Sequence, residues 1–229
     1  MDHTLLNTIT NEVRTVLAQD VSGHGIEHVE RVVKLATSFA KSEGANETIV
    51  VLAALLHDVD DYKLFGQDSA KNLTNANRIM REYNIDATTT NAVLEIIRSM
   101  GYNKYLEGIR PTSLEGMIVS DADMCDAIGA IGILRTHAYA LSKGNEFFDK
   151  TIEPVSVEMS AQQYRDQQKT HSAQHFFDKL LKIPSLLMTA SGRHEGEKRQ
   201  AIMVHFLEEL FAEQDAQNWA NYLEDSPLS

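Results

Sequence analysis

The stretch IVVLAALLHDVDDYK, residues 49–63, runs from eight consecutive apolar residues straight into three aspartates. Such a run without glycine or proline is typical of a helix buried on all sides. At its end His57 is followed by Asp58, and burying this pair costs free energy unless other groups satisfy it. Two interpretations follow. The stretch is either an ordinary helix end, with solvated acids and His57 bonded to a carbonyl, or part of a metal site whose other ligands come from elsewhere in the chain.

Outward from this stretch, apolar residues recur at helical spacing almost throughout, and no alternating strand pattern is found. We therefore predict an all-α fold. Asn46, Asp86 and Ser113 are expected to cap helix starts, and Gly44 to end a helix. The predicted helices cover approximately residues 6–17, 29–40, 46–56, 68–83, 86–97, 113–134, 175–181 and 203–210.

Composition narrows the class of protein. The 229 residues include 21 Lys and Arg against 33 Asp and Glu, a net charge of −12, and 43% are hydrophobic. The hydrophobic content excludes a disordered chain, and the acidic balance argues against a surface that coats nucleic acid. A single cysteine, Cys125, cannot form an internal disulfide. With no signal-peptide pattern and no membrane-spanning run, we expect a soluble, cytoplasmic protein.

A second group of aspartates interrupts an apolar helix in IVSDADMCDAIGAIGILRT, residues 118–136. Asp123 and Asp126 are three residues apart and share a face, whereas Asp121 points elsewhere. A histidine pair, His24 and His28, lies in SGHGIEHVERVVKLA, residues 22–36. Imidazole and carboxylate donors without a thiolate suit Mn²⁺, Fe²⁺, Mg²⁺ or a similar octahedral ion rather than a structural zinc.

The order His28, His57-Asp58, Asp123 resembles the H…HD…D pattern of the HD-domain phosphohydrolase superfamily, and above all its compact, stand-alone bacterial members. Likeness extends to the tail, HFFDKLLK and RQAIMVHFLEELF, and so covers residues 20–213. The resemblance implies a helical bundle forming a single domain over residues 1–229. Its core motifs would lie at about 20–140, with C-terminal helices at 154–224 packing on them.

The resemblance further implies that His28, His57, Asp58 and Asp123 bind a divalent metal ion, with the Asp58 carboxylate able to bridge to a second one. The superfamily pattern places the last aspartate just after a small residue, which selects Asp123 over Asp121. Asp121 would then orient a ligand or a bound water.

Proton transfer is also implied. His24 is similar in position to a histidine that protonates the leaving group in related cyclic-nucleotide phosphodiesterases, a task that suits a pKa near neutrality. Many relatives carry Asp directly after this histidine, where the chain has Gly25. A solvent-facing histidine at a helix start is the alternative. Asp58 or Asp61 is expected to accept the proton of the attacking water.

Three cations are candidates for binding a substrate phosphate. Asp61 and Lys63 resemble the D-x-K that follows the histidine-aspartate pair in these proteins, and Lys104, in MGYNK, resembles a second cation of this kind. Arg31 lies three residues after His28 and can reach the same pocket. The alternatives are a solvated surface position for each lysine and a salt bridge for Arg31.

These features predict a divalent-metal-dependent phosphohydrolase acting on a small phosphorylated metabolite, a nucleotide above all. Mn²⁺, Mg²⁺ or Fe²⁺ is the expected cofactor, with Ni²⁺ and Co²⁺ as further candidates. A non-catalytic ligand-binding or signalling module and a di-iron oxygenase are the alternatives. We expect no nucleic-acid or membrane partner and a possible homodimer, for which the polar stretch 143–170 offers a face unless it shapes the pocket instead.

Overall fold

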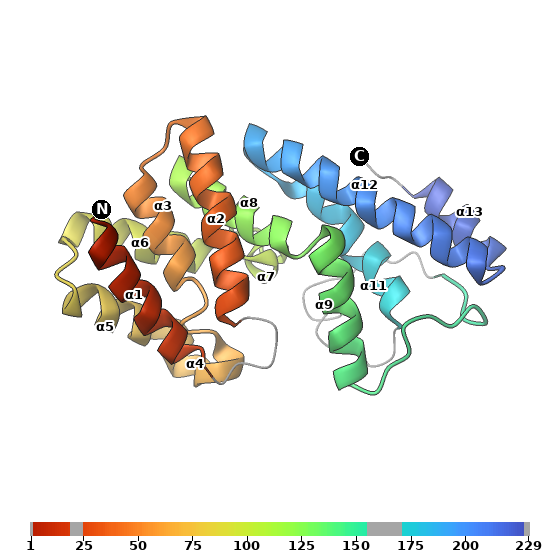
Figure 1. Cartoon of the computed structure of the whole chain (residues 1–229), viewed down its shortest axis with the longest axis horizontal. Helices are drawn as coiled ribbons and strands as arrows, with labels where there is room; N and C mark the ends of the chain where they lie inside the picture. Colours follow the sequence, from red (N-terminus) through yellow and green to blue (C-terminus); the bar gives the residue numbers. More distant parts are fainter. Residues whose placement is uncertain (1, 19–24, 155–170, 227–229) are drawn as a thin grey trace. The chain divides into compact units, whose positions relative to one another are not determined.

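The computed structural model describes residues 2–18, 25–154 and 171–226, and within these ranges it contains helices and turns but no strand. The predicted all-α fold is thereby confirmed (Figure 1). Two compact units make up the chain, an N-terminal unit of residues 1–123 and a C-terminal unit of residues 124–229. Their boundary falls inside a helix, directly after Asp123. One domain over the whole chain stays a prediction.

The N-terminal unit is built around its most apolar helix, α3. Residues 50–56 of α3 are all buried, and α1, α2 and α6 pack around them. Because this helix is apolar on every side, other helices must cover it completely. The helices of this unit are α1 (His3–Val16), α2 (Ile26–Glu43), α3 (Glu47–Leu56), α4 (Tyr62–Asn72), α5 (Thr74–Glu82), α6 (Ala87–Ser99), α7 (Tyr102–Leu106) and most of α8 (Leu114–Asp126).

The helix ends expected from local sequence signals are present. The side chains of Asn46, Asp86 and Ser113 each accept a hydrogen bond from a backbone N–H in the first turn of the helix that follows. Gly44 ends α2 with a φ of 72°, a conformation that glycine adopts without the steric cost of a side chain. These caps fix where α2, α3, α6 and α8 begin or end.

Three of the predicted helices are wrong as single elements. The one predicted over 175–181 spans the end of α11 (Ser172–Asp178) and the start of the 3₁₀ helix η1 (Leu180–Leu186). The helix predicted over 68–83 is split into α4 and α5 at Leu73, which has a left-handed backbone (φ 50°). The helix predicted over 113–134 is split into α8 and α9 at Ile128, ahead of Gly129 with a φ of 76°. The stretch 98–112, which no predicted helix covers, contains the short helix α7.

An aromatic core holds the C-terminal unit together. Trp219 is fully buried, and its indole N–H donates to the carbonyl of Ile152 at 2.8 Å. Phe148, Phe177 and Phe211 surround it, with ring centroids 5.6–5.8 Å from that of Trp219. The helices of this unit are α9 (Gly129–Ser142), α11 (Ser172–Asp178), the 3₁₀ helix η1 (Leu180–Leu186), α12 (Ala190–Glu213) and α13 (Gln217–Asp225).

Acid is expected to unfold the C-terminal unit through His175 in α11. Burial, helped by the positive charge of Lys179, lowers the pKa of His175 to about 3. The folded state therefore keeps His175 neutral, while the unfolded chain takes up a proton near pH 6.5. The contribution of neutral His175 to the free energy of unfolding is fully present above pH 6.5. It is lost as the pH falls towards 3, by up to about 1.4 kcal/mol per pH unit.

Fluorescence of Trp219, the single tryptophan, reports this transition. The midpoint of acid unfolding should lie at a lower pH for His175→Gln than for the wild type. The control His194→Gln, at an exposed position of α12, should have the same midpoint as the wild type. Equal midpoints for all three proteins would contradict the role given to His175.

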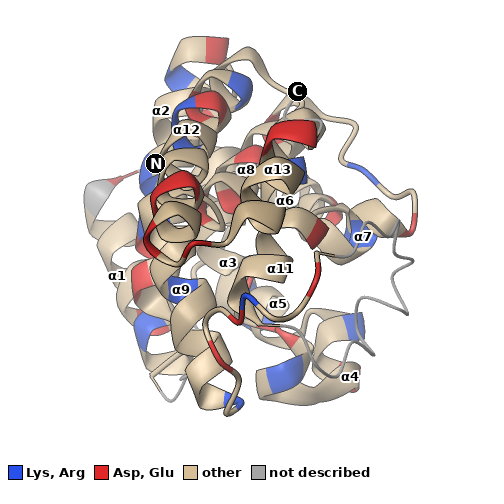
Figure 2. Ribbon diagram, turned by 90° about the vertical axis from the view of Figure 1, so that its right-hand side faces the viewer, with Lys and Arg blue, Asp and Glu red and all other residues tan. Residues whose placement is uncertain are grey.

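Charged side chains are spread over the helices, acidic and basic residues being interleaved on most of them (Figure 2). Among the described helices, no segment combines the length and the apolar character that crossing a membrane requires.

Candidate metal centre

Three helix ends bring the predicted ligands together in the N-terminal unit. His28 lies in the first turn of α2, His57 and Asp58 directly follow α3, and Asp123 lies in the last turn of α8. The short turn between α2 and α3 makes these helices antiparallel neighbours, so the start of α2 meets the end of α3.

The end of α8, which carries Asp123, is positioned by a contact at the other end of that helix. The carboxylate of Glu115, at the start of α8, accepts a hydrogen bond from the backbone N–H of Asn46, at the start of α3, at 3.0 Å. Because α3 and α8 begin together and run in the same direction, their carboxyl ends, which carry the partial negative charge of each helix, also meet.

Two imidazoles and two carboxylates converge there. The Nε2 atoms of His28 and His57 are 3.2 Å apart. Asp58 Oδ2 lies 3.5 Å from the first of these nitrogens and 3.3 Å from the second. Asp123 Oδ1 lies 3.4 Å and 3.9 Å from them, respectively. The histidine side chains are 3% and 4% exposed, whereas Asp123 is 25% exposed, so the group opens to solvent on the Asp123 side.

The two carboxylates beside His57 favour a positive charge at this point of the site. Its Nδ1 lies 2.8 Å from the carbonyl of Ala54, and since a carbonyl only accepts, Nδ1 carries the hydrogen. In the neutral imidazole, Nε2 then presents a lone pair to two carboxylates. Burial opposes a charge here, but Asp58, and after it Asp123, raise the pKa of His57 to about 10. The same imidazoles hold the pKa of Asp123 below its usual value despite burial.

A divalent metal ion fits the same donor set. With ligand bonds of about 2.1 Å, neighbouring ligands on one ion lie roughly 3.0 Å apart in octahedral and 3.4 Å apart in tetrahedral geometry. The distances between the donor atoms fall close to this range. The donor atoms of His28, His57 and Asp58 all lie within 4.8 Å of one another. The cluster can therefore hold a divalent metal, with Asp123 beside it.

The remaining predicted site residues are placed as follows. Asp61 is the N-cap of α4, where its carboxylate accepts a hydrogen bond from the backbone N–H of Lys63. Lys63 is exposed, with its Nζ 5.8 Å from the Tyr62 ring. Arg31 is half-buried on α2, one turn after His28. His24 lies outside the described residues.

The ion pair of Lys104 and the complete burial of Asp121 were not predicted from the sequence. Lys104, on α7, pairs with Glu107 at 3.0 Å in a solvent-exposed ion pair, a type that contributes little to the free energy of unfolding. Asp121 is fully buried in α8, while Asp123 is the aspartate of this helix that reaches the histidines. The functional roles of all these residues stay predictions.

Asp60 is a residue to which sequence reasoning gave no role. It is buried and accepts three hydrogen bonds, one from the hydroxyl of Ser69 in α4 and two from the backbone N–H groups of Asn75 and Ala76 in the first turn of α5. No local sequence signal points to this role, because it depends on α5 beginning after Leu73, whose side chain cannot cap a helix, and only the structure reveals that break.

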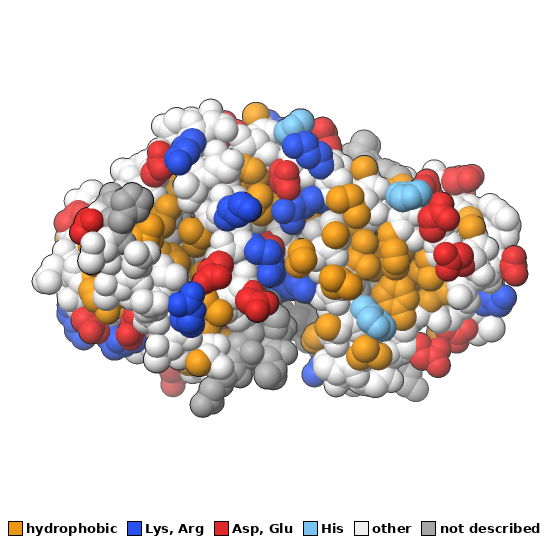
Figure 3. Space-filling view, in the orientation of Figure 1, with side chains coloured by type: hydrophobic (Ala, Val, Ile, Leu, Met, Phe, Trp, Pro, Cys, Tyr) orange, Lys and Arg blue, Asp and Glu red, His pale blue; other side chains and the backbone are white. Residues whose placement is uncertain are grey.

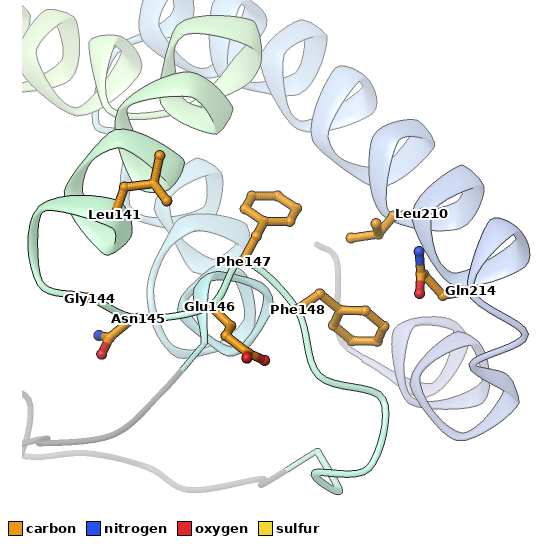
Figure 4. A pocket seen from close by; sticks show the side chains of 8 residues that line it. All are labelled: Leu141, Gly144, Asn145, Glu146, Phe147, Phe148, Leu210 and Gln214. Atoms are coloured by element: carbon orange, nitrogen blue, oxygen red, sulfur yellow. The ribbon is translucent and has the colours of Figure 1, made fainter.

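A hollow of about 510 Å³ opens in the C-terminal unit beside α9 and α12 (Figure 4). Phe147, Phe148 and Leu210 contribute apolar side chains to it, and Glu146 a carboxylate. Its eight lining residues include no Lys, Arg or His, the side chains that neutralise the charge of a phosphate. Hydrophobic side chains also gather on the surface of this unit (Figure 3), where Leu134 and Leu141 of α9 are exposed.

The described residues thus define an all-helical protein with a candidate divalent-metal site of two histidines and two aspartates. A family model, HD domain, matches residues 25–128. YpgQ of Bacillus subtilis is 32% identical over 200 residues, which are 86% of this chain and 88% of YpgQ.

Solved structures agree. A protein from Lactobacillus plantarum is 36% identical with a TM-score of 0.79, covering 94% of this chain and 99% of its own. An HD-superfamily hydrolase from Bacillus thuringiensis is 35% identical with a TM-score of 0.71, at 92% and 97% coverage. YpgQ in complex with ADP has 28% identity and a TM-score of 0.69, at 91% and 97% coverage. The chain belongs to the HD-domain superfamily, and the predicted resemblance is confirmed.

Proposed function

We propose that this protein is a divalent-metal-dependent phosphohydrolase whose substrate is a nucleotide. The observation that carries the proposal is the convergence of His28, His57, Asp58 and Asp123, with their facing nitrogen and oxygen atoms 3.2–3.9 Å apart. The hydrolase among the similar structures supports the reaction class. A nucleotide is supported by YpgQ, which was crystallised with ADP.

A metal ion held by these four residues would lower the pKa of water and neutralise charge on phosphoryl oxygens. Mn²⁺ suits the imidazole and carboxylate donors, as do Mg²⁺ and Fe²⁺. The histidine side chains are only 3% and 4% exposed, so water would be reduced on their side of a bound phosphoryl group, and electrostatic interactions there would be stronger.

The chain's own residues would supply the proton transfers. In hydrolysis, water attacks phosphorus, a carboxylate takes its proton, and the leaving oxygen receives one. Asp58 or Asp61 is the proposed acceptor, since both follow α3 within one turn. His24 is the proposed donor. Arg31, Lys63 and Lys104 would counter the negative charge of the phosphates, which the net charge of −12 otherwise repels.

Release of phosphate and pyrophosphate from a panel of nucleotides with Mn²⁺ tests this function, with Asp58→Ala protein as the blank. Release by the wild type alone is the expected result, and the product identifies the bond that is cleaved. Bound metal without release from any nucleotide would contradict a nucleotide hydrolase and favour a ligand-binding module. An iron chromophore in the purified protein would instead favour a di-iron oxygenase.

A further inference from the structure

We propose that Asp60 is a positioning residue for Asp58: its buried carboxylate anchors the turn that follows α3 to the start of α5, and so holds the Asp58 carboxylate at the two histidines. The inference rests on the metal site of the proposed function.

Asp58 and Asp60 belong to one tight turn. The backbone N–H of Asp61 donates to the carbonyl of Asp58 at 3.1 Å and closes it. Within this turn the Asp58 carboxylate lies at His28 and His57, whereas the Asp60 side chain bonds to α4 and α5. Val59 between them is fully buried. The turn is therefore fixed by side chains that leave it in different directions.

Three donors bind the Asp60 carboxylate, which is only 3% exposed. Its Oδ1 accepts from the hydroxyl of Ser69 at 2.5 Å and from the backbone N–H of Asn75 at 2.9 Å. Its Oδ2 accepts from the backbone N–H of Ala76 at 2.9 Å. Hydrogen bonds to a charged acceptor are stronger than neutral ones, and stronger still where water is excluded.

Helix α5 depends on this carboxylate because it has no cap of its own. Leu73, the residue before its first turn, has a left-handed backbone and no polar side chain. Two first-turn N–H groups of α5, those of Asn75 and Ala76, instead donate to Asp60, a negative charge at the positive end of the helix. The side chain of Asn75 adds a second link by donating to the carbonyl of Val59 at 2.8 Å.

The consequence for the site is preorganisation. A carboxylate on a free turn must lose conformational freedom when it takes up a ligand geometry, whereas Asp58 is already held there. Partners outside the ligand shell of a metal site typically change metal affinity about 10- to 100-fold when they are removed. Asp60 bonds to no ligand and acts through the backbone of the turn, so we take this range as the size of effect expected for its loss.

Binding of Co²⁺, measured by calorimetry and by its visible absorption, tests the inference without relying on turnover. Asp60→Asn keeps the size of the side chain but cannot accept at both oxygens. We expect a loss of Co²⁺ affinity of about 10- to 100-fold and an altered absorption spectrum. Ser69→Ala removes one of the three donors and should give a smaller loss in the same direction.

Asp86→Asn is the matched control. Asp86 caps α6 through two backbone N–H groups, away from the turn, so its loss should lower the melting temperature and leave Co²⁺ binding unchanged. If Asp60→Asn and Ser69→Ala also lower only the melting temperature, Asp60 is a stabilising cap and the inference is wrong. A wild type that binds no Co²⁺ or Mn²⁺ would overturn the metal site, and with it both proposals.

Discussion

Replacing Asp58 by alanine is expected to abolish hydrolysis of the nucleotide that the panel identifies, and to lower Mn²⁺ affinity by more than about 100-fold. Loss of a partner outside the ligand shell costs 10- to 100-fold in affinity, so loss of a ligand must cost more. Asp58 Oδ2 lies within 3.5 Å of both imidazole nitrogens, and its removal takes away one of four donors.

The fold should survive this change, because Asp58 lies in a turn after α3 and the helices around it are held by apolar contacts. Circular dichroism should therefore show wild-type helix content, while calorimetry shows weak or no Mn²⁺ binding. Asp86→Ala, which removes the cap of α6 and no donor of the cluster, controls for the loss of a carboxylate. Turnover by Asp58→Ala at the wild-type rate would remove Asp58 from the site and end the proposed mechanism.

Much of the N-terminal unit follows from local sequence signals. Asn46, Asp86 and Ser113 cap helices because each side chain needs only the backbone two or three residues ahead. The burial of α3 follows from its composition alone. Such features depend on near neighbours in the chain, and these are visible in the sequence.

The breaks at Leu73 and Gly129 depend on distant groups and could not be predicted. A left-handed leucine costs about 1–2 kcal/mol relative to a helical one. Leu73 is nevertheless buried, and Asp60, 13 residues earlier, caps the helix that begins after it. At Gly129, a side chain would meet that of Arg199 at 3.0 Å, and this contact also joins residues far apart in sequence.

The candidate site also contains residues that the sequence predicts and contacts that it does not. Residues that resemble a family motif, His28, His57, Asp58 and Asp123, lie together in the structure. The ion pair of Lys104 and the three bonds of Asp60 form no pattern in the sequence, because their partners are set by how α7, α4 and α5 pack.

The pH should change metal affinity about as strongly as the loss of Asp58, because a proton and a metal ion compete for His57. In the metal-free protein the pKa of His57 is about 10, against 6.5 in the unfolded chain. The raised pKa makes a contribution to stability that is fully present below pH 6.5 and is lost as the pH rises through 10. Without metal, the melting temperature should fall over this range, and bound Mn²⁺ should reduce the fall.

Metal affinity should change in the opposite sense. Between pH 7 and 9 the metal must displace about one proton from His57, so affinity should rise about tenfold per pH unit, or roughly 100-fold over this interval. Calorimetry in buffers of different ionisation enthalpy measures the released proton directly. His57→Gln should bind Mn²⁺ weakly and without this dependence. An affinity that stays flat with pH, with no proton released, would mean that the metal does not replace the proton held between Asp58 and Asp123, and that the raised pKa marks a structural ion pair instead.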